Sequence, residues 1–237
     1  MTSVRHMAVV VPARDEQDHI EACLFSITAA IAELRHRHPG VTCDATVVLD
    51  CCTDQTGPLA RAHGARTVRS CAGRVGAARH AGAIDAITRA REAGIPADAV
   101  WLANTDADTI VPGSWLTTQW QFANTGADAV IGTVTPDRLN RHANRLWRQR
   151  HRLVEGHDHI HGANLGLRAS TYQTVGGFAA VSLHEDLDLV DRIKAGGYRW
   201  EATHQTTVTT SARTASRVEG GFASYIAELG PKDSSCA

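Results

Sequence analysis

The sequence predicts a single α/β domain in which a mostly parallel sheet lies between two layers of helices. Short apolar runs alternate with amphipathic helical stretches over the first 103 residues, which is the pattern of a parallel sheet. A polar segment follows each of the main apolar runs, as expected where strands end. The 237 residues, with 43% hydrophobic and 21% charged residues, fit one globular domain. We expect the domain to cover residues 1–229 and the tail, residues 230–237, to be disordered.

The N-terminal half predicts its elements in regular alternation. Proline and glycine punctuate the helices: Pro39 and Gly40 end the first, and Gly94 and Pro96 end the third. The strands are short and rich in valine and alanine, as buried strands are. We expect strands at 7–11, 45–50, 65–68 and 99–103, and helices at 16–38, 55–63 and 76–93.

The second half is less regular. The segment 127–134 is typical of a strand, and 138–155 predicts an arginine-rich helix. A helix over 185–195 is stopped by Gly196 and Gly197. Two further strand-like runs follow at 199–202 and 206–210. No internal repeat or low-complexity linker divides the chain.

Charge and cysteine usage restrict the partners and the compartment. The formal net charge of −1 argues against a general nucleic-acid-binding protein, which normally carries a basic excess. No apolar run is long enough to span a bilayer. The six cysteines show no metal-ligand spacing, and Cys51 and Cys52 are adjacent, so we expect reduced thiols and a cytoplasmic location. Nearly all positive charge is arginine, which binds phosphate in a bidentate manner.

The strongest local signal is Asp106-Ala107-Asp108, which follows the predicted strand 99–103. Residues i and i+2 of an extended segment project to the same side, so the two carboxylates can converge. Two such carboxylates repel each other and favour a hard divalent cation that also carries phosphate oxygens. A solvated loop or a helix N-cap is the simpler alternative for this motif.

Three polar strand ends are expected to form one site. The segments 12–16, 50–54 and 104–108 all follow strands of the predicted parallel sheet. In such sheets, ligands bind outside the carboxyl ends of the strands. The predicted site is therefore a composite of three segments far apart in the chain.

Four segments in order resemble the family 2 glycosyltransferases, whose nucleotide-sugar-binding fold is called GT-A. They are Val9-Val10-Val11-Pro12-Ala13-Arg14-Asp15-Glu16, then Val48-Leu49-Asp50-Cys51-Cys52-Thr53-Asp54-Gln55-Thr56, then Asp106-Ala107-Asp108, and finally Gly162-Ala163-Asn164 with Val175-Gly176-Gly177-Phe178 and His184-Glu185-Asp186-Leu187-Asp188-Leu189. The resemblance covers roughly residues 7 to 205. Leu49, Cys51 and Cys52 depart from the family's usual Asp, Gly and Ser, and this affects the surroundings of the nucleobase.

The resemblance implies a role for each matching residue. It implies that Asp50 faces the nucleobase, that Glu185 faces the acceptor and that Asp186 is the general base. The residues it assigns to the nucleotide are Pro12, Ala13, Arg14, Glu16, Asp50, Arg79 and Asp106, and those it assigns to the metal are Asp106, Asp108 and His204. The cofactor would be Mn²⁺ or Mg²⁺.

Each of these residues also has a simpler explanation. Asp50 can form an Asx-turn or cap the following helix, and Glu16 can favour the positive end of the first helix. Arg79 follows the glycines of Gly73-Arg74-Val75-Gly76, which suit an anion site at a helix start, but a surface arginine would look the same. Glu185 and Asp186 are ordinary in the first turn of a helix.

Two further segments are candidates for the acceptor side and for closure. His157, His159 and His161 alternate as on one face of an extended segment; without an acidic or cysteine partner at zinc-like spacing, they indicate an acceptor lining or plain surface. The run 211–217, with Arg213 and Arg217, is either a loop that closes over the diphosphate or part of a flexible C-terminus.

We therefore expect a metal-dependent, inverting glycosyltransferase of the hexosyltransferase type. Its donor would be a nucleotide sugar, with a UDP-sugar favoured, and its acceptor a hydroxyl on a small molecule or on a lipid-linked compound reached from the membrane periphery. A sugar nucleotidylyltransferase is the nearest alternative, but its Gly-rich loop after the first strand is replaced here by residues 12–16. A non-catalytic nucleotide-sugar-binding protein is the third possibility.

Overall fold

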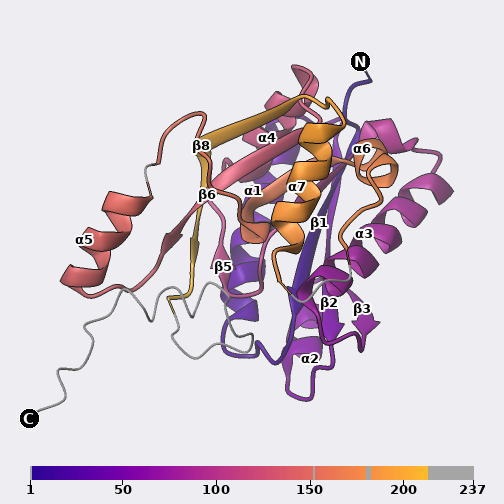
Figure 1. Cartoon of the computed structure of the whole chain (residues 1–237). Helices are drawn as coiled ribbons and strands as arrows, with labels where there is room; N and C mark the ends of the chain where they lie inside the picture. Colours follow the sequence, from indigo (N-terminus) through magenta and orange to yellow (C-terminus); the bar gives the residue numbers. More distant parts are fainter. Residues whose placement is uncertain (1, 152, 180–182, 213–237) are drawn as a thin grey trace, which may run out of the picture.

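The computed structural model describes residues 2–151, 153–179 and 183–212, which form an eight-stranded sheet with helices on both faces (Figure 1). The strand order is β3-β2-β1-β4-β7-β6-β8-β5. The strands are β1 His6–Ala13, β2 Thr42–Asp50, β3 Arg66–Ser70, β4 Val100–Asn104, β5 Thr109–Ile110, β6 Ala129–Pro136, β7 Leu165–Arg168 and β8 Trp200–Thr210. The helices are α1 Ile20–Arg37, α2 Thr56–Ala62, α3 Val75–Glu92, α4 Trp115–Asn124, α5 Arg141–Arg150, α6 Ala169–Thr174 and α7 Glu185–Ala195, with 3₁₀ turns η1 Ala97–Ala99 and η2 Gly162–Asn164.

The sheet is mostly parallel. Strands β1 to β4 pair in parallel, and so do β6 and β8. The short β7 is antiparallel to both of its neighbours, β4 and β6, and β5 is antiparallel to β8. This arrangement places the carboxyl ends of β1, β2 and β4 at one edge of the sheet, where ligands bind in parallel α/β folds.

Alternation along the central strands builds two cores. In β1, Val9 and Val11 pack on one face of the sheet, whereas Ala8 and Val10 pack on the other, and all four are at most 1% exposed. A strand buried on both faces has a continuous apolar sequence, which explains the run Met7-Ala8-Val9-Val10-Val11. Successive side chains of β1 therefore enter cores on opposite faces of the sheet.

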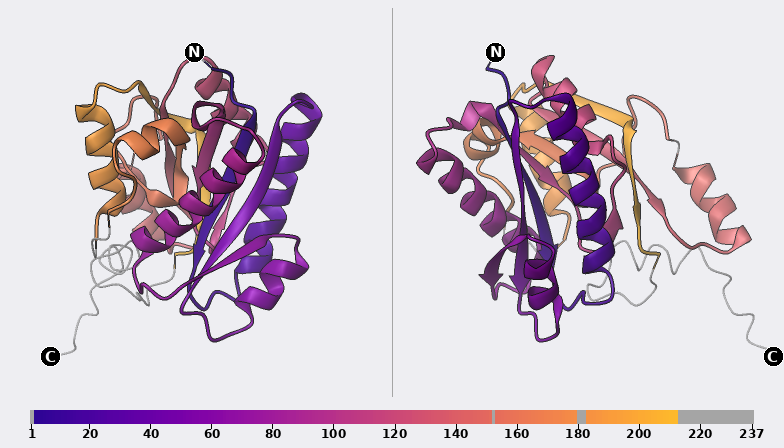
Figure 2. Two further views of the ribbon diagram at one scale, coloured as in Figure 1. Left: turned by 90° about the vertical axis from the view of Figure 1, so that its right-hand side faces the viewer. Right: turned by 180° about the vertical axis from the view of Figure 1, so that it is seen from behind.

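The helices divide between the two faces (Figure 2). Helices α1, α2 and α4 cover one face, where Ile20, Ala60 and Trp115 are fully buried. Helices α3, α6 and α7 cover the other, where Ala86, Tyr172 and Ile193 are buried. Helix α5 belongs to neither layer and stands away from the body of the protein in both figures. No helix among the described residues combines the length and the apolar character needed to cross a membrane.

The predicted α/β fold with a mostly parallel sheet is confirmed, and several elements differ in detail. Helix α5 spans Arg141–Arg150, shorter than the predicted 138–155. The two runs predicted at 199–202 and 206–210 form one strand, β8, whose register to β6 shifts between Gly132 and Val134. Elements β5, α4, β7 and α6 were not predicted. The predicted disordered tail, 230–237, lies outside the described residues.

Candidate active site

A buried arginine lies at the centre of the candidate site. Arg79, near the start of α3, is only 3% exposed. Its Nη2 donates to Asp106 Oδ1 at 2.6 Å, and its Nη1 donates to Glu185 Oε1 at 2.5 Å. Burial acts to lower the pKa of Arg79, but the carboxylates of Asp106 and Glu185 outweigh it and raise that pKa. One guanidinium thus joins two acids separated by 79 residues of chain.

Two glycines let the backbone approach this ion-pair cluster. A Cβ at Gly162 would lie 2.5 Å from Arg79 Nη1, and a Cβ at Gly76 would lie 2.9 Å from Glu185 Cγ. Both distances are too short for any side chain, so only glycine allows η2 and α3 to pack here. The ring of Phe178, 5.7 Å from the Arg79 guanidinium, covers another side.

The two acidic residues at the start of α7 have different surroundings. Glu185 is 6% exposed, and burial raises its pKa while Arg79 opposes the rise. Asp186 is half-buried; its Oδ2 accepts the Gly162 N–H at 2.7 Å and its Oδ1 accepts the Leu187 N–H at 2.9 Å. His184, in the left-handed region at φ 62°, turns the chain into the helix. Asp186 is therefore held in a fixed orientation beside the Arg79 cluster.

Asp106 and Asp108 lie in the loop that follows β4. Both are half-buried, and burial together with their negative charges raises the pKa of the buried Cys23 thiol, so both carboxylates lie close to the same side chain. Asp108 Oδ1 accepts a hydrogen bond from Thr210 at 3.3 Å, at the end of β8. The structure thus brings Asp106 to Arg79 and Asp108 to the end of β8.

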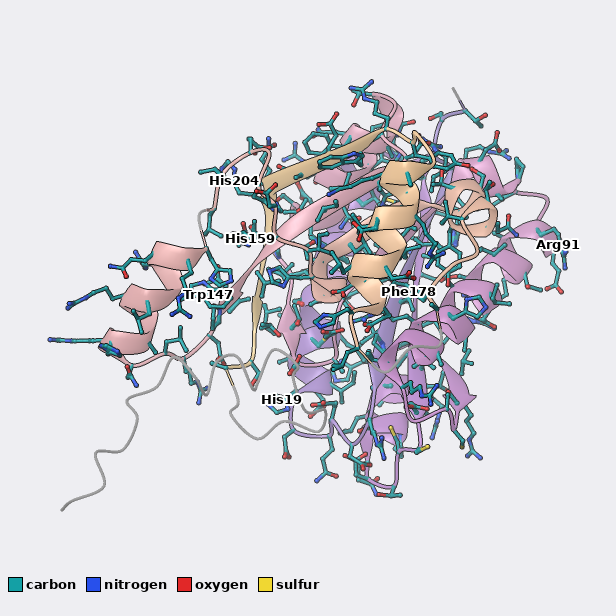
Figure 3. The ribbon with its side chains drawn as sticks, viewed as in Figure 1. His19, Arg91, Trp147, His159, Phe178 and His204 are labelled. Atoms are coloured by element: carbon teal, nitrogen blue, oxygen red, sulfur yellow. The ribbon has the colours of Figure 1, made fainter. Side chains whose placement is uncertain are left out.

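The structure does not bring His204 to these aspartates. Its Nδ1 lies 2.8 Å from Glu155 Oε1 on the exposed side of β8 (Figure 3). Thr203 pairs with Gly132 and Thr210 pairs with Pro136, so His204 lies about three strand positions, roughly 10 Å, from Thr210. The expectation that His204 is a third metal ligand therefore does not fit this geometry.

Asp50 closes β2 at the predicted nucleotide edge. It is 4% exposed, and its Oδ1 accepts the Ser70 hydroxyl at 2.9 Å and the Gly73 N–H at 3.2 Å. These bonds hold the segment between β3 and α3 against the end of β2. Arg14 lies over the same segment, because a Cβ at Gly73 would be 3.9 Å from its Nη1. Among the hydrogen bonds of the described residues, the Asp50 side chain accepts none from residues 51–54. The Asx-turn, which was the simpler expectation for Asp50, is therefore not formed.

The loop after β1 is fastened to the loop after β2. Pro12 and Ala13 are the last, buried residues of β1. Asp15, at φ 50°, accepts the Thr53 N–H at 2.7 Å and the Asp54 N–H at 3.3 Å. Glu16 is 5% exposed, and its Oε2 lies 3.3 Å from His19 Nδ1.

One other acidic cluster lies in these two loops. The ligand atoms of Asp15, Cys52 and Asp54 lie within 4.8 Å of one another, the only such group of three among the described residues. However, the Asp15 and Asp54 oxygens already accept N–H and O–H bonds from neighbouring loop residues. We therefore assign this cluster to joining the two loops.

The histidines form a stacked group between α5 and α7. His151 stacks on Trp147 with ring centroids 3.6 Å apart, and its ring lies 4.7 Å from His159 and 6.5 Å from His161. Figure 3 labels Trp147 and His159. Burial lowers the pKa of His161 to about 4, although Asp186 acts to raise it. His157 is also buried, with its Nε2 3.4 Å from the Thr203 carbonyl. Of the three histidines predicted to line the acceptor site, His161 is the one that interacts with Asp186.

Sequence reasoning missed His151 and Trp147 as members of this group. Their spacing of four residues on a helix is the signal that could have identified the pair, because such residues lie on one face. In the predicted closing segment, Ser211 donates its N–H to the Asp108 carbonyl at 3.1 Å. Arg213 and Arg217 lie outside the described residues.

The fold is shared with several solved glycosyltransferase structures. S. aureus TarS 1-349 has a TM-score of 0.60 and 14% identity, and the match covers 88% of this chain and 61% of that one. Mannosyltransferase PcManGT from Pyrobaculum calidifontis, in complex with GDP-Man and Mn²⁺, has a TM-score of 0.60 and 17% identity over 89% and 58%. Glucosyl-3-phosphoglycerate synthase from Mycobacterium tuberculosis, in complex with phosphoglyceric acid, has a TM-score of 0.56 and 17% identity over 88% and 73%.

The chain thus spans less than two thirds of the length of the TarS and PcManGT structures. No curated protein sequence matches it significantly. The family model described as "Glycosyltransferase like family 2" matches residues 5–216, which include every candidate residue of the cluster around Arg79. The chain therefore belongs to glycosyltransferase-like family 2.

Proposed function

We propose that the protein transfers a sugar from a nucleotide-sugar donor to an acceptor hydroxyl, with inversion at the anomeric carbon. The observation that carries the proposal is the shared ion pair of Arg79 with Asp106 and Glu185. The Arg79 guanidinium holds Asp106, which follows β4, close to Glu185, which begins α7. A transferase that joins two substrates requires such proximity between donor and acceptor groups.

The donor would lie along the ends of β1, β2 and β4. Asp50 lies at the far end of this edge, where its carboxylate suits the imino N–H of uracil, and this supports a UDP-sugar as donor. The solved relatives divide on this point, because TarS was solved with UDP and PcManGT with GDP-Man. The surroundings of Asp50, including Cys51 and Arg14, therefore decide the choice of base.

The donor atoms near β4 fit a Mn²⁺ or Mg²⁺ ion. Asp106 and Asp108 provide hard carboxylate oxygens from half-exposed positions beside Cys23, and such ions take one or two carboxylates plus phosphate oxygens. When bound, the metal would supply positive charge to the diphosphate leaving group. PcManGT and the M. tuberculosis synthase were both solved with Mn²⁺.

Asp186 would act as the base. The acceptor oxygen attacks the anomeric carbon, its proton passes to an Asp186 carboxylate oxygen, and the bond from the anomeric carbon to the diphosphate oxygen breaks. The bonds from Gly162 and Leu187 fix the Asp186 carboxylate for this task. Glu185, which is held by Arg79, would contact the acceptor rather than take the proton.

The test is release of nucleoside diphosphate from a panel of UDP- and GDP-sugars with and without Mn²⁺, together with calorimetry of UDP binding. We expect metal-dependent UDP binding that Asp108→Asn weakens at least tenfold, while Glu92→Gln, an exposed change at the C-terminal end of α3, leaves it unaltered. Unaltered metal dependence in Asp108→Asn would refute the assignment of the metal site. Release of pyrophosphate from a nucleoside triphosphate and a sugar phosphate would instead identify a nucleotidylyltransferase.

A further inference from the structure

Helix α5 carries a concentration of positive charge that the proposed chemistry does not use. The segment 138–152 contains six arginines and no acidic residue, although the whole chain has a net charge of −1. Arg138, Arg141, Arg145, Arg148 and Arg150 are all exposed. The helix projects from the body of the protein, so this charge is presented at its periphery (Figure 1).

The arginines occupy the side of α5 that faces away from the protein. At 100° per residue, Arg141, Arg145 and Arg148 fall within about 60° of one another on the helix. The buried residues Ala143 and Trp147 lie on the opposite side, where they pack with half-buried Leu139, Leu146 and Ala212. The apolar side of the helix is thus already covered, and the basic side is the one left for a partner.

Internal ion pairs do not account for this charge. Within the described part of the chain, no acidic residue forms a salt bridge with Arg141, Arg145 or Arg150. Arg148 donates to Asn144, and Arg138 approaches Asp137 at 3.7 Å while 91% of its side chain stays exposed. By contrast, Arg89 on α3 pairs with two acids. The positive charges of the α5 arginines are therefore available to bind a partner outside the molecule.

The shape of the basic side indicates an extended anionic surface. From Arg141 to Arg148 the stripe is about 10 Å long on a convex helix, so the three guanidinium groups cannot converge on one small anion. They can each meet a separate charge of a flat array. Shortly after α5 in the chain, the side chains of Leu153 and Val154 are 42% and 47% exposed, so exposed apolar side chains follow the basic helix. Basic residues with neighbouring apolar side chains suit the surface of an anionic bilayer.

We propose that α5 docks the protein on lipid bilayers that carry anionic headgroups, through Arg141, Arg145 and Arg148. Ring contacts from Trp147 through His151 to His161 connect this helix to the loop whose Gly162 N–H binds Asp186. Docking therefore places the acceptor side of the site close to the membrane. This last step rests on the proposed function and makes the acceptor a lipid-linked hydroxyl compound.

The test is co-sedimentation of the full chain with vesicles of phosphatidylcholine containing about 30% phosphatidylglycerol, compared with pure phosphatidylcholine. We expect binding to the anionic vesicles only, with release at high salt because screening weakens it. The variant Arg141→Gln/Arg145→Gln/Arg148→Gln should lose affinity about 100-fold, as each arginine contributes roughly a factor of five. The control Arg61→Gln/Arg66→Gln/Arg91→Gln removes the same charge from exposed positions elsewhere and should stay within about twofold of wild type.

Each outcome decides the proposal. Salt-sensitive binding that the α5 variant loses and the control keeps supports it. No binding to anionic vesicles, equal losses in both triple variants, or binding to heparin or nucleic acid but not to vesicles overturns it. Because the assay contains no sugar donor, its result is separate from the proposed function. An unchanged circular dichroism spectrum and an unchanged Tm of the same triple variant confirm that the variant is folded.

Discussion

Replacing Arg79 with methionine tests whether its positive charge stabilises the fold by pairing with both Asp106 and Glu185. Methionine keeps an unbranched apolar stem, although it is shorter than arginine, and it leaves Asp106 and Glu185 without their shared cation. Arg79 is 3% exposed and Glu185 is 6% exposed, so water cannot replace the lost guanidinium around Glu185. The variant therefore buries an uncompensated negative charge.

The expected cost follows from this burial. Removing one partner of a buried ion pair destabilises proteins by about 3–5 kcal/mol, because the remaining charge stays desolvated. For a chain of this size, each kcal/mol lowers Tm by about 2–4 °C, so the drop should be roughly 6–20 °C. Asp106 is one-third exposed at its side chain and contributes the smaller share.

The pH dependence distinguishes this cause from loss of packing. Burial raises the pKa of Glu185 in the folded protein, and Arg79 acts to lower it. Without Arg79 the folded pKa rises further above the unfolded value, so the folded state binds more protons and gains stability as the pH falls. The deficit of Arg79→Met relative to wild type should therefore be largest near pH 7.5 and should shrink towards pH 5.

Urea unfolding at both pH values measures the two free energies. Arg91→Met is the matched control, because Arg91 is an exposed residue of the same helix that forms no salt bridge with any described acid. We expect the control to stay within about 0.5 kcal/mol of wild type. A cost below about 1 kcal/mol for Arg79→Met, or a cost that does not change with pH, would refute the reasoning.

Three further changes probe the nucleotide edge, the base and the core. Asp50→Ala should weaken UDP binding by calorimetry about tenfold with an unchanged circular dichroism spectrum; equal wild-type affinity for UDP and GDP would defeat this. Asp186→Asn should lower kcat by about 10²- to 10⁴-fold with donor binding retained, whereas the control Asp191→Asn should leave kcat unchanged. A product with retained anomeric configuration would contradict the role of Asp186 as the base. Gly132→Ala, whose Cβ would meet Asn164 Nδ2 at 2.2 Å, should destabilise by about 3 kcal/mol or more in urea, unlike Gly40→Ala, which is in open space.

The sequence predicted the N-terminal half well because its signals are local. The apolar run of β1 and the Pro39-Gly40 stop after α1 each depend on neighbouring residues only. Strand β7, with the four residues Leu165–Arg168, carries no period of its own, because its burial is set by β4 and β6 on either side. The register shift in β8 depends on its pairing with β6, and no local pattern announces it.

In the candidate site, too, features that depend on local sequence were predicted, and features that depend on tertiary packing were not. Asp106, Glu185 and Asp186 were selected from motifs, and the structure brings them together around Arg79. Arg79 was expected to contact the nucleotide, but its two strong bonds go to protein acids, which depends on the packing of Gly162 and could not be seen in the sequence. His204 does not join Asp108 in the structure, because its ring pairs with Glu155 several strand positions before Thr210.

The Arg79 cluster links the two ligand sites of the proposed reaction. A divalent cation that bound Asp106 would compete with the guanidinium, which would then interact more strongly with Glu185. This stronger interaction would favour the ionised form of Glu185, so a donor that carried the metal would affect the charge beside the acceptor. Thermodynamic linkage would make the effect reciprocal: an acceptor that engaged Glu185 would change the affinity of Asp106 for the metal by the same factor. The internal counter-ion would thereby couple the two binding events.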